Sequence, residues 1–139
     1  MMRSVDELAS IAVDCGFHIH QELGPGLLES VYEIVLARAL SDQGLSVVRQ
    51  KPVAITFRGM VIADAFRADL VVDDRLIVEI KSVEKNHPVH AKQLLTYLRL
   101  SKQPLGLLMN FGCATFREGV KRVANGHKDL GDFASWREK

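Results

Sequence analysis

Two charged side chains interrupt a segment whose other residues are almost all apolar. Residues 76–82 read LIVEIKS, which places Glu79 and Lys81 among side chains suited to a half-buried β-strand. Strand side chains alternate between two faces, so both charges lie on the same face. Burying charged groups is costly unless they are paired or bound to something, so these two either neutralise each other or serve a site.

A third candidate, Asp69, lies in the preceding predicted strand, before a turn signal at residues 73–74. Antiparallel pairing would bring this strand beside the one that contains Glu79. A two-residue loop would place Asp69 opposite Val78, on the face away from Glu79. A three-residue loop that includes Arg75, or a bulge, would place Asp69 beside Glu79. A site built from these residues therefore requires the second register.

Asp69, Glu79 and Lys81 are residue types that suit the hydrolysis of phosphodiesters. Two close carboxylates raise each other's pKa unless a cation lies between them, and such oxygen ligands favour Mg²⁺ or Mn²⁺. A divalent ion held by both carboxylates lowers the pKa of a bound water. The lysine can orient that water and neutralise the charge that develops on a phosphate.

The composition limits the classes of protein to consider. The chain has 139 residues, of which 47% are hydrophobic and 25% charged, as expected for one globular domain over residues 1–139. A net charge of +1 argues against a strongly basic, non-specific nucleic-acid binder. No apolar run is long enough for a membrane span, and the N-terminus lacks a signal-peptide core, so we expect a cytoplasmic protein without membrane contacts.

The periodicity of apolar residues predicts an α/β fold. Two N-terminal helices meet at a glycine-proline corner, and Ser4 with Glu7 forms a capping box for the first of them. A three-stranded antiparallel meander, a helix that begins near Pro88 and a further strand follow. The expected helices span residues 4–22, 27–44 and 86–102, the strands span 46–57, 60–72, 75–81 and 104–111, and residues 115–126 form a short strand end or a helical turn.

The order of the candidate residues resembles a known nuclease core. Asp69, followed by Glu79-Ile80-Lys81 on the next strand, resembles the D…(D/E)xK pattern of the PD-(D/E)XK nuclease superfamily. The resemblance runs from about His20 to Lys121-Arg122. The position before Asp69 is alanine rather than proline, a difference that removes no ligand.

Two further motifs support this resemblance. GLLESVY, with Gly26, Glu29 and Tyr32, resembles the namesake motif of the GxxExxY family within that superfamily. Gln93 and Tyr97 are similar to the QxxxY motif of RecB-like nucleases, and residues four apart project from one face of a helix.

The resemblance implies a restriction-endonuclease-like core and a metal-dependent nuclease, with DNA as the expected nucleic acid. Asp69, Glu79 and the carbonyl of Ile80 would hold Mg²⁺ or Mn²⁺, and Lys81 would be the catalytic lysine. Glu29 would approach the metal from the second helix. Gln93 and Tyr97 would shape the site.

Plainer interpretations remain open. Glu79 and Lys81 could be a cross-strand pair on a solvated face, and the fold could serve as a non-catalytic module that binds nucleic acid or protein. The small size leaves room for a homodimer or an accessory protein partner. Glu33 is expected on the helix surface, and Tyr32 is expected to pack while its hydroxyl fixes a carboxylate.

Other polar residues give weaker signals. The close pairs His18 with His20 and His87 with His90 do not have the order of a zinc site, and His20 is expected to brace the helix junction. Both cysteines are expected to be small buried hydrophobic residues. Basic residues that could follow a phosphate backbone are Arg67, Lys85, Lys92, Arg99, Arg117, Lys121 and Arg122.

Overall fold

The computed structural model describes residues 2–126 of the chain, and within them a mixed sheet has the strand order β1-β2-β3-β4-β5. The predicted antiparallel meander of β1, β2 and β3 is confirmed. β3 and β4 pair in parallel, and β4 and β5 pair in antiparallel fashion. The strands are β1 Val47–Phe57, β2 Met60–Val72, β3 Leu76–Lys81, β4 Leu105–Asn110 and β5 Val120–Ala124.

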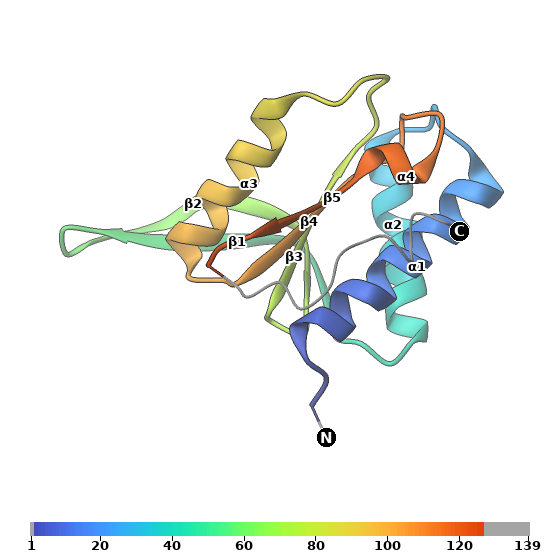
Figure 1. Ribbon diagram of the computed structural model, residues 1–139. Helices are drawn as coiled ribbons and strands as arrows, with labels where there is room; N and C mark the ends of the chain where they lie inside the picture. The colour runs from blue at the N-terminus through green and yellow to red at the C-terminus, as the bar shows by residue number, and fades with distance from the viewer. Residues whose placement is uncertain (1, 127–139) are drawn as a thin grey trace.

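The helices lie on both faces of this sheet, as Figure 1 shows. α1 and α2 cover one face, and α3 covers the other while it connects the parallel strands β3 and β4. The predicted α/β architecture is therefore confirmed. The helices are α1 Val5–Leu23, α2 Glu29–Asp42, α3 Pro88–Ser101 and the short α4 Phe116–Gly119.

Local signals in the sequence explain where the helices begin and end. Ser4 and Glu7 form the predicted capping box of α1, with reciprocal side-chain to backbone hydrogen bonds of 3.1 and 3.2 Å. Gly24, with φ of 72°, ends that helix in a conformation that favours glycine. Pro88 occupies the first turn of α3, where the missing N–H costs nothing. For residues 115–126 the sequence predicts a short strand end or a helical turn, and the structure contains both, as the helical turn α4 and the strand β5.

Strand alternation divides the apolar residues into two cores. Val78 and Ile80 of β3 pack with α1 and α2, whereas Ile77 packs with Leu94 and Leu98 of α3. Glu79 and Lys81 share the parity of Ile77, so they lie on the face that α3 covers.

The β1–β2 hairpin projects well beyond the rest of the sheet, which is clear at the left of Figure 1. Its tip is a two-residue turn at Arg58-Gly59, a turn signal that the sequence places between the expected strands 46–57 and 60–72, and these residues have φ of 49° and 79°. Positive φ at both central residues is typical of a type I′ turn, which matches the twist of the strands.

Two remaining expectations concern cysteines and membranes. Both cysteines are free thiols; Cys113 is buried as expected, but Cys15 is only half-buried. Burial is the main cause that raises the pKa of each thiol. Among residues 2–126 there is no helix with the length and apolar character needed to cross a membrane.

Candidate active site

The loop between β2 and β3 gives the hairpin the register that a site requires. Leu70 pairs with Val78, and the hairpin closes through a three-residue loop, 73–75. The next residues along the two strands are Asp69 and Glu79, which therefore lie side by side. Of the two registers considered from the sequence, the structure has the one that brings both carboxylates to one face.

The two carboxylates are held by the backbone of each other's strand. Glu79 Oε2 accepts a hydrogen bond of 2.8 Å from the N–H of Asp69. Asp69 Oδ2 accepts one of 2.8 Å from the N–H of Ile80. This reciprocal pair of bonds fixes both side chains in one place before any ligand arrives.

The surroundings of Glu79 disfavour its charged form. Burial is the largest cause, and the neighbouring charge of Asp69 is the next, so that the pKa of Glu79 rises to about 8. The hydrogen bond from Asp69 and the charge of Lys81 oppose this rise, and Glu33 adds to it. A buried carboxylate beside a half-buried one, each repelling the other, has the chemistry that suits a small, hard cation such as Mg²⁺ or Mn²⁺.

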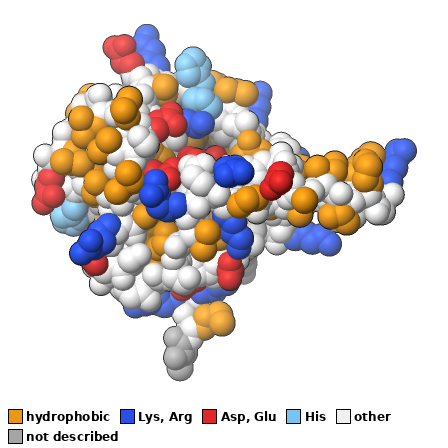
Figure 2. All heavy atoms as spheres, turned by 180° about the vertical axis from the view of Figure 1, so that it is seen from behind, with side chains coloured by type: hydrophobic (Ala, Val, Ile, Leu, Met, Phe, Trp, Pro, Cys, Tyr) orange, Lys and Arg blue, Asp and Glu red, His pale blue; other side chains and the backbone are white. Residues whose placement is uncertain are grey.

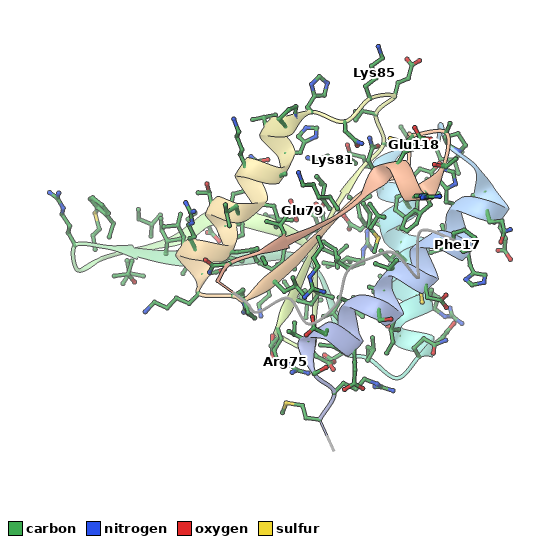
Figure 3. All side chains as sticks on the ribbon, viewed as in Figure 1. Phe17, Arg75, Glu79, Lys81, Lys85 and Glu118 are labelled. Atoms are coloured by element: carbon green, nitrogen blue, oxygen red, sulfur yellow. The ribbon has the colours of Figure 1, made fainter. Side chains whose placement is uncertain are left out.

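Lys81 ends β3 on the same face as Glu79, and Figure 3 shows both side chains on this strand. The Lys81 side chain is half-buried, and its charge acts on the pKa values of both Glu79 and His90. Burial is the first cause that lowers the pKa of His90, followed by Lys81 and His87. Lys81 is therefore within electrostatic range of the carboxylate pair and of the start of α3.

The chain that follows Lys81 is fixed by Asn110, a buried residue that the sequence interpretation did not consider. The Oδ1 atom of Asn110 accepts hydrogen bonds of 3.0 Å from the N–H groups of Val83 and Gly112. A Cβ atom on Gly112 would lie 2.3 Å from the carbonyl oxygen of Val83, so only glycine fits there. The end of the lysine strand is therefore packed tightly against the end of β4.

Glu33 does not lie on the helix surface, and that prediction is wrong. It is buried, with 6% of its surface exposed. The Nε of Arg49 donates to Glu33 Oε2 at 3.0 Å, and the Nε2 of Gln50 donates to Glu33 Oε1 at 2.7 Å. Two donors from β1 satisfy this carboxylate, which explains how α2 can bury it.

Gln50 connects Glu33 to the carboxylate pair, a link that the sequence interpretation missed. Its Nε2 also donates to Asp69 Oδ1 at 3.2 Å. Both oxygens of Asp69 are thus held, one by Gln50 and the other by Ile80. Gln50 has φ of 50°, a conformation that costs energy for a residue other than glycine.

Glu29 lies at the edge of this arrangement rather than within it. It is the exposed first residue of α2 and lines a cleft of about 760 Å³ together with Ser82, which follows Lys81. The charge of Glu29 opposes the lowering of the His90 pKa, so Glu29 lies within electrostatic range of that residue. It has no hydrogen bond to Asp69 or Glu79, and its approach to a metal stays a prediction.

The predicted Gln93–Tyr97 pair lies on α3, over the same face of the sheet. Tyr97 stacks on Phe66 of β2, with ring centroids 3.9 Å apart. Burial, and then the charges of Glu79 and Asp69, raise the pKa of its hydroxyl. Tyr97 is thus close to the carboxylates, whereas Gln93 is exposed one turn earlier.

Tyr32 and His20 have partners other than those expected. Tyr32 packs in the core against Phe111, as predicted, but its hydroxyl donates to the Gly24 carbonyl at 2.5 Å and fixes the glycine-proline corner instead of a carboxylate. His20 contacts the Cys113 carbonyl at 2.9 Å and so braces α1 against the loop after β4 rather than the helix junction.

The histidines do not form a metal centre in residues 2–126. No group of three or more His, Cys, Asp or Glu side chains in this range is arranged to hold a metal ion. His87 and His90 contact each other at the start of α3, with ring centroids 5.7 Å apart. A metal at the carboxylate pair would use two side chains and a backbone oxygen, which is fewer side chains than such a group contains.

The basic residues expected near the site do not all lie there. Arg122 forms an ion pair with Asp6 of α1. Lys85 projects from the loop between β3 and α3, beyond Lys81 (Figure 3). Acidic, basic and histidine side chains lie beside apolar ones on the upper part of the face drawn in Figure 2, so this face is mixed rather than uniformly positive.

Comparison with known families agrees with this geometry. The family model described as the PD-(D/E)XK nuclease superfamily matches residues 6–123 of the chain. The chain belongs to the PD-(D/E)XK nuclease superfamily. No curated protein matches the chain with significance. The matched range includes every strand of the described sheet except the last residue of β5, so the PD-(D/E)XK match covers the whole hairpin that carries the carboxylate pair.

Proposed function

We propose that this member of the superfamily is a metal-dependent nuclease that hydrolyses phosphodiester bonds of nucleic acid, with DNA as its substrate. One observation carries the proposal. Asp69 and Glu79 are locked side by side on neighbouring strands, and Lys81 follows on the same face. These groups suit metal-dependent hydrolysis of phosphodiesters.

The proposed cofactor is Mg²⁺ or Mn²⁺, held by Asp69, Glu79 and the carbonyl oxygen of Ile80. The raised pKa of Glu79 supports this assignment, because an added cation would compensate both the burial of the carboxylate and the repulsion from Asp69 that raise it. When bound, such an ion activates water and polarises a phosphoryl oxygen.

The chain's own residues have distinct proposed roles around that position. Lys81 orients the attacking water and neutralises charge on the phosphate. Tyr97 and Gln93 line the approach from α3, and Glu29 adds a carboxylate in the neighbouring cleft that it lines with Ser82. Gln50 acts through Asp69 as a positioning residue, because it holds the Oδ1 atom.

We further propose that the chain belongs to the GxxExxY group of the superfamily. The support is the order of Gly26, Glu29 and Tyr32 at the start of α2. Tyr32 fixes the corner that contains Gly24, and the corner in turn presents Glu29 to the cleft.

A non-catalytic module for binding nucleic acid or protein is the second candidate. It is favoured by the fact that each carboxylate accepts a backbone hydrogen bond from the opposite strand, so the pair persists without a metal. Titration calorimetry with MnCl₂ separates the two functions. A nuclease site binds Mn²⁺, and Asp69→Asn abolishes this binding. A non-catalytic module shows no Mn²⁺ binding that depends on the carboxylates.

The direct test is a cleavage panel of single-stranded and double-stranded DNA and RNA, with Mg²⁺, with Mn²⁺ and with a chelator. We expect metal-dependent cleavage that Asp69→Asn and Lys81→Ala each abolish while circular dichroism stays unchanged. Glu22→Gln and Lys102→Ala, which are exposed and distant in sequence, are the matched controls. Cleavage that persists in both site variants would refute the assignment.

A further inference from the structure

The outer part of the β1–β2 hairpin, residues 53–66, which we call the arm, has an unusual composition for an exposed segment. Arg58 and Asp64 are its only charged residues. Four large apolar side chains are exposed within six positions near its tip. They are Phe57 at 55%, Met60 at 56%, Val61 at 68% and Ile62 at 39%. Figure 2 shows the arm as a projection with mainly apolar side chains and a basic end.

These apolar side chains lie on both faces of the arm. Phe57 pairs with Met60 across the hairpin, and the next pair is Thr56 with Val61, which strand alternation places on the opposite face. Within the described part of the chain, β1 is also an edge strand, with no neighbour on its outer side. A two-stranded ribbon with exposed apolar side chains and a free edge is marginal by itself in water, so a partner that covers these side chains would stabilise it.

The charges of the arm identify the chemistry of this partner. One cation and one anion give the arm no net charge, which does not suit a polyanion such as nucleic acid. Arg58 is at the tip, whereas Asp64 lies further in along β2. If two arms lie antiparallel, Arg58 of each faces Asp64 of the other. Within residues 2–126 neither residue has an ion-pair partner of its own.

The backbone of Arg58 gives independent support. Its φ of 49° belongs to the first central position of a type I′ turn, where Asn, Asp or Gly is favoured. The guanidinium lies over the ring of Phe57, 5.1 Å from its centroid. An arginine in a position where a smaller residue would be more stable points to a role for its side chain.

We propose that the arm is a homodimer interface, in which the arms of two copies of this chain pack antiparallel about a twofold axis. Phe57, Met60 and Ile62, which share one face of the arm, form its apolar centre. Two symmetric pairs between Arg58 and Asp64 set the direction, because a parallel arrangement would bring like charges together. This interface is independent of the chemistry at Asp69 and Glu79.

A charge exchange tests the proposal by sedimentation velocity over a range of protein concentrations. We expect a dimer for the unmodified chain. Arg58→Asp or Asp64→Arg alone should weaken the dimer about tenfold or more, because each places two like-charged pairs in the interface. The double variant should return to within about threefold of the original dissociation constant, since it restores both pairs in reverse.

Both substitutions are at exposed positions, and aspartate suits the turn at residue 58 better than arginine does, so the variants should fold. Phe57→Ser with Met60→Ser should give a monomer, whereas Val89→Ser, which changes an exposed apolar residue on α3, should remain dimeric. A monomeric unmodified chain, or a double variant as weak as the single ones, would overturn the proposal. The proposal would also be overturned if the arm variants stayed dimeric but lost binding to a DNA duplex.

Discussion

Glu33 and Glu79 are both buried glutamates within one polar network, yet their surroundings differ. Glu33 is 6% exposed and receives a guanidinium and an amide from β1. Glu79 is 8% exposed and receives one backbone N–H beside a second carboxylate. Hydrogen-bond donors satisfy both oxygens of the Glu33 carboxylate. The Glu79 carboxylate is instead repelled by Asp69, and a bound cation could relieve that repulsion.

This difference separates a carboxylate that positions its neighbours from one that could take part in the reaction. A buried carboxylate with a cationic partner is stable without a ligand and fixes the position of its neighbours. A buried carboxylate whose pKa is raised by its burial and by a neighbouring like charge is destabilising at neutral pH until something binds, which is typical of functional sites. Gln50 joins the two, because its amide donates to both Glu33 and Asp69.

The largest expected effect is on catalysis. Glu79→Gln should reduce metal-dependent cleavage by about 10³-fold or more, since it removes a proposed ligand. Glu33→Gln should reduce it by only about tenfold, because it acts through Gln50 and Asp69. Single-turnover cleavage assays at saturating Mg²⁺ measure both. Equal losses of cleavage in the two variants would contradict the assignment of a positioning role to Glu33 and a ligand role to Glu79.

The next effect concerns stability and pH in the metal-free protein. A carboxyl whose folded pKa is raised to about 8 costs nothing below about pH 4.5 and becomes destabilising as pH rises towards 8. The free energy of unfolding should therefore fall by about 4 kcal/mol more over this range in the unmodified chain than in Glu79→Gln. Urea unfolding between pH 4.5 and 8.5 with a chelator measures the difference. Parallel pH profiles would contradict the raised pKa.

The Glu33 carboxylate should stabilise the fold at neutral pH, whereas the Glu79 carboxylate should destabilise it. Glu33→Gln replaces an acceptor of the Arg49 guanidinium with a neutral amide, and Arg49 is 45% exposed, so water compensates part of the loss. We expect a destabilisation of about 1–2 kcal/mol by urea unfolding at neutral pH. The matched control is Asp42→Asn, which removes the exposed pair with Arg38 and should cost less than about 0.5 kcal/mol.

The smallest effect is expected at Tyr97. Tyr97→Phe retains the stack on Phe66 and removes only the hydroxyl, so stability should change by no more than about 0.5 kcal/mol. If the hydroxyl helps to order substrate near the carboxylates, cleavage should fall a few-fold with little change in Mg²⁺ affinity. A large loss of Mg²⁺ affinity would instead place Tyr97 in the ligand network.

Much of the fold could be predicted because local rules agree with the packing. The capping box at Ser4, the proline of α3 and the turn at Arg58-Gly59 each act within a few residues, and all three are present. Strand parity was equally informative, since it reduced the position of Asp69 to a choice between two registers.

Glu33 was missed although the sequence contains a signal for it. It lies on the same helical stripe as Leu36 and Leu40, three and seven residues later, which predicts burial by spacing. The assumption that a helical glutamate is exposed prevailed over this pattern. The link through Gln50 could not be predicted, because it depends on a positive φ in β1 and on contacts to residues 17 and 19 positions away.

The three-residue connection between β2 and β3 makes this site sensitive to insertions and deletions. A homologue with one residue fewer at 73–75 would keep every motif letter, yet its aspartate would point towards α1 and α2. Among relatives of this chain, conserved loop length is therefore a better criterion for an active enzyme than the conserved letters alone.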